Sequence, residues 1–501
     1  VAPGNGGTAS EPKARNVPIG VMDFDALVAH ALAEGIGLTV ISPEDPLAAG
    51  IVDRFRAAGL TVFGPTAAAA RLESSKAWAR AFMVRHRIPS PDFAVARDLT
   101  TAEAAIRRMG GRCVVKADGL AAGKGVVVAD SAEEATTAAR AMLVDGGFGA
   151  AGEQVLIEER LEGPELSVMA ITDGVHYRLL PLAQDHKRLM DGDTGPNTGG
   201  MGSYAPVTVT PKVMELILKG VVEPTLRGMR DEGHPFSGCL FCGLMLTAEG
   251  PKVIEFNSRL GDPETQVQLP LLKTDLVTLL RAAAEERLGE VQLKIDASRS
   301  AICVILAAAG YPEASRKGDA ILGLSAAERI RGVKILQAGS RRVTDGTIET
   351  SGGRVLSVVA VAESLDAARR LAYRAIDRRL KDRGVDDPTG VGFAGMQWRM
   401  DIAQTNVSKQ RGWLTRLWTR GTLDNRLLRQ GETLRSLGCG LLFICWVSLC
   451  VVVFRPPTFW FILLGLAVSY LMLAVADISR ALATVVARSM DPVDHDTLQD
   501  P

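Results

Sequence analysis

The sequence lacks the features that mark several common classes of protein. Lysine plus arginine equals aspartate plus glutamate, 57 each in 501 residues, so no overall charge indicates a nucleic acid or an acidic partner. No basic start followed by an apolar stretch opens the chain, so we expect no secretory signal. What the chain does have is length, enough for three or four domains with cores of their own.

The sequence also lacks a clear metal-binding or redox cluster of cysteines. Its seven cysteines have mostly apolar neighbours. Cys239 and Cys242 form a C-x-x-C, but within an apolar, strand-like run and without a second pair or a histidine cluster. We therefore expect buried thiols rather than a zinc or redox site.

The segment 252–266, KVIEFNSRLGDPETQ, begins as a strand and is then too polar for a core. In an extended strand Glu255 and Asn257 share one face, while Ile254 and Phe256 pack behind them. Two neighbouring hard oxygen donors suit Mg²⁺, which usually takes one or two carboxylates together with substrate phosphates. The segment therefore predicts a metal site for Mg²⁺ or Mn²⁺, and the alternative is a polar strand end followed by a surface turn.

Residues 113–128, CVVKADGLAAGKGVVV, predict a strand, a glycine-rich loop and a second strand. A Walker loop would run into a helix, whereas here a β-branched strand follows Lys124 and Gly125, which indicates a hairpin flap. Glycines let the backbone approach phosphates closely, and Lys116 and Lys124 add positive charge. The flap therefore predicts a triphosphate site, and the alternative is a plain hairpin with solvated lysines.

Residues 184–202 form the third constellation, which starts QDHKR and ends DTGPNTGGMG. Four glycines and a proline in the last ten residues argue against a helix or a strand interior, and such a loop exposes backbone amides. With Asp185 for an ammonium and Lys187 for a carboxylate, it suits a zwitterionic amino acid. His186 stays outside the predicted site, because a lone histidine is more often structural.

Together the three motifs predict an ATP-dependent carboxylate-amine ligase. A carboxylate would attack the γ-phosphate of ATP, and an amine would displace phosphate from the resulting acyl phosphate. Positioning and electrostatic stabilisation supply most of the acceleration in such reactions, so no covalent enzyme nucleophile is needed.

The run RLGDPETQ at 259–266 resembles the signature of the phosphoribosylamine-glycine ligase (glycinamide ribonucleotide synthetase) family of ATP-grasp enzymes. The resemblance extends from Val1 to about Ile402. It implies ATP with Mg²⁺ or Mn²⁺, the substrates glycine and 5-phosphoribosylamine, a role in de novo purine biosynthesis, and no nucleic acid. Other possibilities are a different ATP-grasp ligase of purine metabolism, or a membrane-tethered, catalytically impaired ATP-binding homologue.

The motifs and the resemblance together assign site residues. The catalytic set is Lys116, Lys124, Arg259 and Asp262, and the metal ligands are Glu255 and Asn257. The ATP contacts are Lys76, Lys116, Gly123, Lys124, Gly125, Glu158, Glu159 and Glu165. The substrate contacts are Gly4, Asn5, Glu44, Pro46, Asp185, Lys187, Thr194, Gly195, Pro196, Asn197, Thr198, Gly199, Gly200, Asp262 and Glu264.

The predicted fold class is α/β, an ATP-grasp fold with a small C-terminal α/β domain. The sequence predicts helices at 23–33, 46–58, 72–86, 213–232 and 275–288, and a hairpin that pairs 238–246 with 252–256. Apolar runs that alternate with helices predict a parallel sheet in the N-terminal substrate domain. Compared with the family, the first strand, phosphate loop and helix of that domain are expected to be missing. The expected domains are 1–90 (substrate), 91–292 (ATP-grasp, with a lid at about 113–180) and 293–403 (C-terminal), followed by a basic linker (404–436), a transmembrane hairpin (437–476) and a polar tail (477–501).

The predicted hairpin rests on two charge-free apolar spans, 437–454 and 458–476, separated by Arg-Pro-Pro. Each is near the minimum length that crosses a hydrocarbon core. The basic flank predicts that both termini lie on the cytoplasmic side, with the catalytic part in the cytoplasm and the chain tethered to a lipid bilayer. The alternative is a buried hairpin in a soluble protein.

Overall fold

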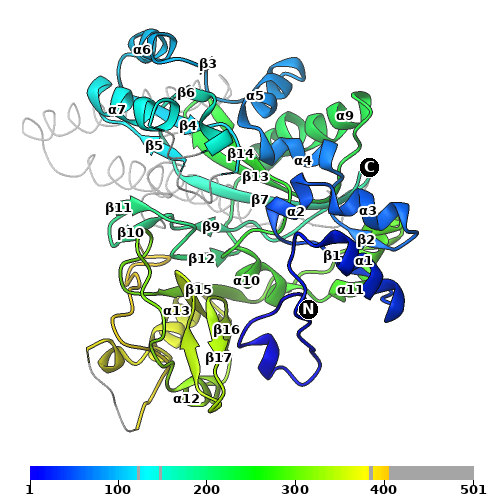
Figure 1. Cartoon of the computed structure of the whole chain (residues 1–501), viewed down its shortest axis with the longest axis vertical. Helices are drawn as coiled ribbons and strands as arrows, with labels where there is room; N and C mark the ends of the chain where they lie inside the picture. Colours follow the sequence, from blue (N-terminus) through cyan, green and yellow to red (C-terminus); the bar gives the residue numbers. More distant parts are fainter. Residues whose placement is uncertain (121–124, 146–148, 383–386, 405–501) are drawn as a thin grey trace, which may run out of the picture. The chain divides into compact units, whose positions relative to one another are not determined.

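The computed structural model describes residues 1–120, 125–145, 149–382 and 387–404 (Figure 1). These residues belong to one structural unit, Val1–Gln410. Gly123, Lys124 and the predicted membrane hairpin lie outside the described residues. Within the described ranges, none of the helices combines the length and the apolarity that a membrane span requires.

The N-terminal part pairs β1 (Thr39–Val40) with β2 (Val62–Phe63) in parallel, as predicted. The predicted helix at 23–33 is confirmed as α1, and its cap Asp23 accepts a hydrogen bond from the amide of Ala26. The predicted helix at 46–58 is wrong in one respect, because it divides at Gly50, whose φ of +88° favours glycine. The helices here are α1 (Phe24–Ala33), α2 (Glu44–Ala48), α3 (Ile51–Ala57) and α4 (Ala67–Ser74).

The single helix predicted over 72–86 is also wrong. The chain is extended at Ser75, with φ −137° and ψ 106°, and α5 (Lys76–Arg85) begins just after it. The Ser75 side chain accepts a hydrogen bond from the Trp78 amide, so a residue that looked like a helix interior is an N-cap.

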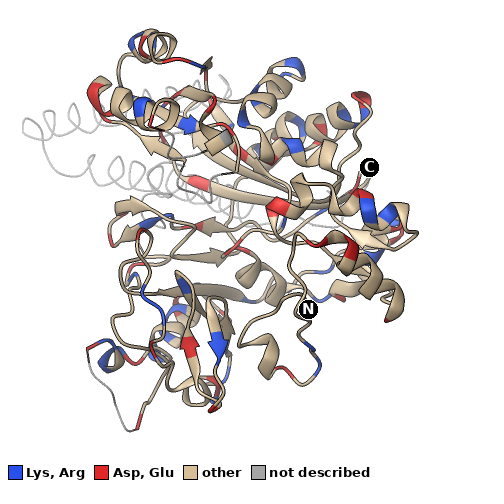
Figure 2. Ribbon diagram, viewed as in Figure 1, with Lys and Arg blue, Asp and Glu red and all other residues tan. Residues whose placement is uncertain are grey.

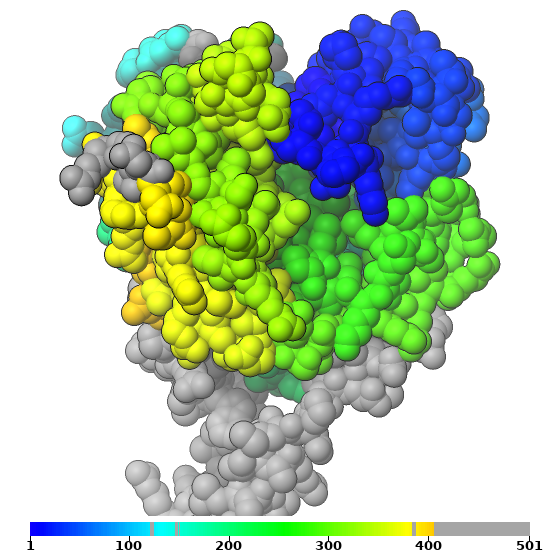
Figure 3. Space-filling model, turned by 90° about the horizontal axis from the view of Figure 1, so that it is seen from below, coloured from blue at the N-terminus to red at the C-terminus, as the bar shows by residue number. Residues whose placement is uncertain are grey.

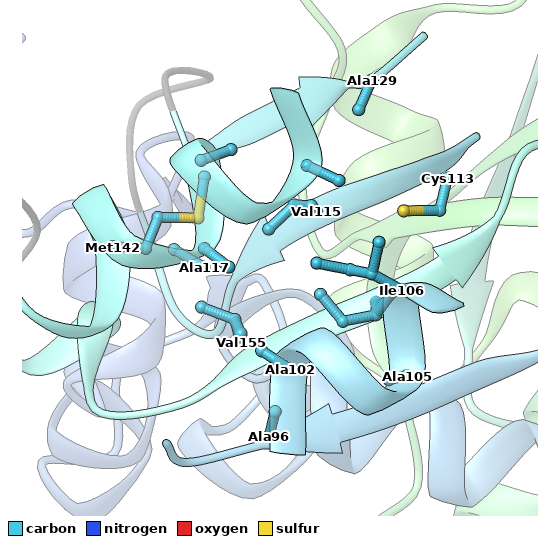
Figure 4. Packing of buried hydrophobic residues seen from close by; sticks show 14 residues of the cluster. Ala96, Ala102, Ala105, Ile106, Cys113, Val115, Ala117, Ala129, Met142 and Val155 are labelled. Atoms are coloured by element: carbon cyan, nitrogen blue, oxygen red, sulfur yellow. The ribbon is translucent and has the colours of Figure 1, made fainter. Parts of the chain in front are cut away.

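The predicted flap is confirmed as an antiparallel pair within a four-stranded sheet, β3-β6-β4-β5. Two helices, α6 and α7, contact each other and this sheet. Figure 4 shows the core between them, where small side chains such as Ala102, Ala105 and Ala117 pack around Ile106 and Met142. The bounds are β3 (Phe93–Ala96), α6 (Leu99–Arg108), β4 (Cys113–Ala117), β5 (Val126–Val128), α7 (Ala132–Leu143) and β6 (Val155–Glu159).

A second four-stranded sheet, β14-β13-β7-β8, carries the predicted metal strand. β13 and β14 form the expected antiparallel hairpin, and β7 pairs with the other edge of β13. Cys239 and Cys242 lie on β13 and are buried, as predicted, and burial raises the pKa of both thiols. The bounds are β7 (Glu165–Asp173), β8 (Tyr177–Leu179), β13 (Ser237–Thr247) and β14 (Gly250–Asn257).

Two helical segments accompany this sheet. The predicted helix at 213–232 is α8 (Pro211–Ile217) and α9 (Glu223–Asp231), joined by a π-helical turn, Leu218–Val222. Pro224 cannot donate to the carbonyl of Gly220, which accounts for an irregular ladder at this point. The predicted helix at 275–288 is the shorter α11 (Leu276–Ala284), and α10 (Thr265–Gln268) follows the metal strand.

The third sheet, β16-β19-β15-β12-β9, joins segments from two predicted domains. β12 pairs with β15 on one side and with β9 on the other. The strand β9 carries Asp185, so the predicted amino acid site continues the sheet of the C-terminal part (Figure 1). The bounds are β9 (Gln184–Asp185), β12 (Gly202–Ala205), β15 (Ser300–Ala307), β16 (Val333–Gln337), β19 (Arg354–Ala362), with α12 (Leu324–Glu328) and α13 (Leu365–Arg374).

The glycine-rich segment is not all loop, as the sequence had suggested. β10 (Arg188–Met190) pairs with β11 (Thr194–Asn197) in a small hairpin. Pro196 falls within a register shift of this hairpin, where no ladder donor is required, so proline is tolerated.

The N-terminal loop contacts the C-terminal part. Asn5 Nδ2 donates to the carbonyl of Gln337, 2.8 Å away, and the Gly6 amide donates to the carbonyl of Ser340. Figure 3 shows the N-terminal residues beside the residues near 340. The short pair β17 (Ser340–Arg342) and β18 (Ile348–Thr350) completes this side.

Candidate active site

A buried ion cluster joins the flap sheet to the metal strand. Lys116 on β4 lies 2.8 Å from the Glu158 carboxylate on β6, and its Nζ also donates to the carbonyl of Ile254 on β14, 3.1 Å away. Arg80 on α5 donates two hydrogen bonds to the same carboxylate, of 2.7 and 2.9 Å. All three side chains are at most 4% exposed, so the position of Lys116 is fixed from several elements.

The charges in this cluster are strongly coupled. Burial alone would raise the pKa of Glu158, but Lys116 and Arg80 outweigh it and hold the pKa at about 2. Burial lowers the pKa of Lys116, and the nearby Glu158 opposes that shift. Glu158 is therefore ionised at neutral pH, and in this structure it holds Lys116 rather than facing solvent.

The base of the flap is fastened to the start of α5. Lys76 Nζ donates to the carbonyl of Gly119, 2.7 Å away. The Asp118 carboxylate accepts hydrogen bonds from the Ala77 amide and from the Ser75 hydroxyl, at 3.0 and 3.2 Å. Lys76 therefore lies at the base of the flap, and on the opposite side the Gly125 carbonyl accepts a hydrogen bond from the Ala117 amide.

The predicted metal strand matches the expected alternation only in part, because Ile254, which was expected to pack behind the strand, is half-buried and the register of β14 against β13 shifts between Val253 and Glu255. On β14, Phe256 is buried, whereas Glu255 and Asn257 are half-buried. Glu255 lies 3.1 Å from Lys187 Nζ, and this lysine also lies 3.8 Å from Glu165 on β7. Lys187 lowers the pKa of Glu255 to about 2, so the carboxylate is ionised, and Glu255 in turn raises the pKa of Lys187. Figure 2 shows the basic and acidic residues over this part of the ribbon.

The donor set fits a divalent ion that also takes phosphate oxygens. Among the described residues, no group of three or more His, Cys, Asp or Glu side chains could enclose a metal by itself. One ionised carboxylate and one amide oxygen on the same strand face match the ligation that Mg²⁺ prefers when substrate phosphates complete its shell.

Two carboxyl groups, those of Asp185 and Glu264, belong to the region that was predicted to bind the amino acid. Glu264 is 2% exposed and accepts a hydrogen bond of 2.8 Å from Ser167 on β7. Burial raises its pKa, and burial together with the neighbouring Glu264 raises the pKa of Asp185 well above its usual value. The pair therefore holds a proton more readily than an exposed carboxyl would.

Three amides of the glycine-rich loop, which the sequence suggested as donors to a carboxylate, have acceptors within the protein. The Thr198 amide donates to the carbonyl of Lys187, the Gly199 amide to the Tyr311 hydroxyl and the Gly200 amide to the Thr198 hydroxyl. Because these donors already have protein acceptors, Asp185 and Lys187 are left as the principal polar side chains of this region.

Arg259 and Asp262, on either side of Gly261, contact different parts of the protein. Arg259 approaches Glu44 at 3.3 Å and Glu73 at 3.4 Å, so it ties the DPE turn to the N-terminal part. Burial raises the pKa of Glu73, against the opposing effect of Arg259. The Asp262 carboxylate lies 3.1 Å from Arg354 Nη2 on β19 and accepts from Gln266 at 2.7 Å.

The remaining predicted residues are more scattered. Asn5 Oδ1 accepts from the amides of Gly7 and Thr8, so its side chain organises its own loop next to Gly4. Pro46 is buried on α2, and Glu159 is half-exposed, 3.5 Å from Lys252. His186 is 1% exposed and accepts a hydrogen bond from the Ala403 amide, which agrees with a structural role.

Comparison with known proteins identifies the family. Phosphoribosylglycinamide synthetase domain models match at 1–73 (N domain), 74–265 (ATP-grasp A domain) and 301–405 (C domain). Phosphoribosylamine-glycine ligase of Vibrio parahaemolyticus is 46% identical over 413 residues, covering 82% of this chain and 93% of the relative. That of Xanthomonas campestris is 50% identical over 378 residues, covering 75% and 87%. The chain belongs to the phosphoribosylamine-glycine ligase family.

Solved structures agree with this assignment. Phosphoribosylamine-glycine ligase of Thermotoga maritima is 37% identical, with a TM-score of 0.60 over 68% of this chain and 81% of that chain. A biotin carboxylase domain from Hydrogenobacter thermophilus, at 17% identity and TM-score 0.57 over 80% and 85%, shares the fold alone. The chain is therefore an ATP-grasp ligase, and its N domain, which we had expected to be incomplete, is present at residues 1–73.

Four residues of this ligase site were missed in the sequence, namely Arg80, Glu73, Ser167 and Arg354. Arg80 and Glu73 lie on helical segments where charged residues usually face solvent, so no periodicity singles them out. Ser167 follows Glu165 on a strand, and alternation could have placed it on the same face. Arg354 follows Gly352 and Gly353, and this pair of glycines was the one available signal.

Proposed function

We propose that the chain joins glycine to 5-phosphoribosylamine at the expense of ATP, giving glycinamide ribonucleotide, ADP and phosphate in de novo purine biosynthesis. The observation that carries the proposal is the identity of 46 to 50% with phosphoribosylamine-glycine ligases over most of the chain. The site geometry supports it, because Lys187, which follows β9, lies 3.1 Å from the Glu255 carboxylate on β14, and Lys116 of β4 donates to the carbonyl of the adjacent Ile254.

The reaction would proceed in two steps. A glycine carboxylate oxygen attacks the γ-phosphorus of ATP, the bond to the bridging oxygen of ADP breaks, and a glycyl phosphate forms. The amine of phosphoribosylamine then attacks the carbonyl carbon, phosphate leaves, and the amide nitrogen loses a proton. Lys116 and Arg259 would offset charge on the phosphates, as Lys124 would from the flap, and water exclusion would protect the acyl phosphate.

Glu255 and Asn257 would hold Mg²⁺ or Mn²⁺. When bound, the ion would neutralise charge on the triphosphate oxygens. Lys187, which pairs with Glu255 in this structure, would offset the charge of the glycine carboxylate. Asp185 would accept the glycine ammonium, with Glu264 and the segment 194–200 behind it.

The remaining predicted contacts belong to the same proposal. Lys76, Gly123, Gly125, Glu158, Glu159 and Glu165 would lie around ATP, either directly or, for Glu158, through Lys116. Gly4, Asn5, Glu44 and Pro46 would line the phosphoribosylamine site, next to Arg259 and Asp262. The link between Glu44 and Arg259 supports this, since it brings the N-terminal part to the catalytic turn.

A coupled assay for ADP release tests the proposal. We expect release only when glycine, phosphoribosylamine and ATP are all present, with the amide product identified by mass spectrometry. ATP binding without turnover would instead support a catalytically impaired homologue. Turnover with a different acid and amine pair would support another ATP-grasp ligase.

We also propose, from the sequence alone, that residues 437–476 tether the chain to a bilayer while the catalytic part faces the cytoplasm. The support is the length of the two apolar spans and their basic flank. Membrane fractionation of the full-length chain tests this proposal. Recovery in the soluble fraction would refute it.

A further inference from the structure

One residue of the glycine-rich loop, Gly199, is hydrogen-bonded through both its amide and its carbonyl to side chains of the C-terminal part. The amide of Gly199 donates to the Tyr311 hydroxyl, 3.0 Å away, and its carbonyl accepts from Arg354 Nη1 at 2.5 Å. Gly199 is exposed, so water could have served both groups. Instead, both groups bond to side chains, those of Tyr311, which follows β15, and of Arg354, which begins β19.

The same arginine also holds the turn that leads to Glu264. Its Nη1 donates to the carbonyl of Asp262, 2.9 Å away, and its Nη2 lies 3.1 Å from the Asp262 carboxylate. A guanidinium is a rigid fork with several donors, which suits it to bridging two backbone segments at once. Arg354 thus connects the glycine-rich loop to the Asp262 turn.

The joined segments enclose Asp185 with little spare room. A Cβ atom on Gly200 would come within 2.5 Å of the Pro263 ring and 2.7 Å of Asp185 Oδ1. The loop backbone therefore sits directly against the carboxyl that we assign to the glycine ammonium. A shift of the loop by a fraction of an ångström would change the space around that carboxyl.

Packing also fixes the position of Tyr311. A Cβ atom on Gly353 would lie 2.5 Å from the Tyr311 ring, so the absence of a side chain at 353 lets the tyrosine stand where it does. The pair of glycines before Arg354 therefore has a physical role that the sequence alone did not reveal.

We propose that Arg354 and Tyr311 are positioning residues that hold the glycine-rich loop against Asp185 and so set the affinity for the amino acid substrate. The inference rests on the proposed function, because it takes the zwitterion at Asp185 to be glycine. Neither residue needs to touch ATP or the transferring phosphate.

Steady-state kinetics of the full-length chain test the inference, with glycine and ATP varied separately. For Arg354→Gln we expect the KM for glycine to rise about ten- to a hundredfold, because charge-assisted hydrogen bonds are lost, with the KM for ATP changed less than about twofold. For Tyr311→Phe, which removes one neutral hydrogen bond, we expect a rise of about three- to tenfold. Gly353→Ala, which removes no polar group, should raise the same KM by displacing the tyrosine ring.

Arg369→Gln is the matched control. Arg369 also donates to two backbone carbonyls of the C-terminal part, those of Met400 at 2.6 Å and Ile402 at 3.1 Å, but not to the glycine-rich loop or the Asp262 turn. A similar glycine KM in the Arg354 and Arg369 variants would overturn the inference. Absence of glycine-dependent ADP release in the wild-type chain would instead refute the proposed function.

Discussion

Two regions of the site use the same kinds of charged residue in opposite ways. The nucleotide region (Arg80, Lys116, Glu158, Glu255) alternates cations with carboxylates, and each carboxylate lies within hydrogen-bonding distance of a cation. In the acceptor region (Asp185, Glu264, Gly199, Arg354) one carboxyl, Glu264, raises the pKa of another, Asp185, and Arg354 donates to backbone carbonyls and pairs with Asp262.

The difference appears in the titration of the carboxyls. Cations hold the pKa of Glu158 and Glu255 at about 2, whereas burial raises the pKa of both Asp185 and Glu264, and the Glu264 carboxyl raises that of Asp185 further. The nucleotide region therefore keeps its charge over the physiological range of pH. The acceptor region changes its charge nearer to neutrality, so pH should act on amino acid binding before it acts on ATP binding.

The largest effect is expected from Glu255→Ala. Removing the ionised carboxylate takes away the proposed metal ligand and the partner of Lys187, so kcat should fall at least about a thousandfold, comparable to losing a main electrostatic group at a transition state. Circular dichroism should show an intact fold. Glu249→Ala is the control, since Glu249 is an exposed carboxylate of the same hairpin, paired with Lys252. Normal turnover of Glu255→Ala at saturating Mg²⁺ would refute the metal assignment.

Arg80→Met should cost about 3 to 5 kcal/mol in the free energy of unfolding, because it breaks a buried ion cluster and leaves the Val253 carbonyl without its donor. Arg85→Ala on the same helix is the matched control. Arg85 pairs with Glu232 at the surface, where such pairs contribute about 0 to 1 kcal/mol. Denaturant unfolding measures both values, and equal losses would show that burial does not distinguish the two pairs.

The pH dependence of kcat/KM for glycine should show an acid limb that is absent from ADP affinity. As pH falls through the raised pKa of the pair, Asp185 gains a proton and loses its attraction for an ammonium, so kcat/KM should fall by up to about tenfold per pH unit. Glu264→Gln should move this limb to lower pH, because it removes the neighbouring negative charge. A limb that stays in place would show that the two carboxyls are not coupled.

The smallest effect is expected from Ser75→Ala. Loss of the N-cap of α5 should cost about 1 kcal/mol of stability and, because Ser75 also holds Asp118 at the base of the flap, raise the KM for ATP severalfold. Thr66→Ala removes the corresponding cap of α4 and should cost similar stability without changing that KM. An equal effect of both variants on ATP would show that Asp118 does not depend on Ser75.

Local patterns in the sequence predicted much of the molecule. The alternation of Glu255 and Asn257 with Phe256, the flap hairpin of β4 and β5, and the parallel pair of β1 and β2 were all visible there. The errors came where a residue was compatible with two local structures and a contact with another segment decided between them. Ser75 became a cap because Asp118 and the Trp78 amide were within reach, and Thr194–Asn197 became a strand because a partner strand, β10, lay beside it.

The chemistry of the site can be inferred from the sequence, because residue types and their spacing along one strand or one loop are local properties. The sequence placed two oxygen donors on β14, lysines beside a glycine-rich flap, and Asp185 next to Lys187. Which charges neutralise each other depends instead on the assembled fold. Glu158 meets Arg80 and Arg354 meets Gly199 across long separations in the chain, and Glu264 lies near enough to raise the pKa of Asp185; such arrangements depend on how the sheets are assembled.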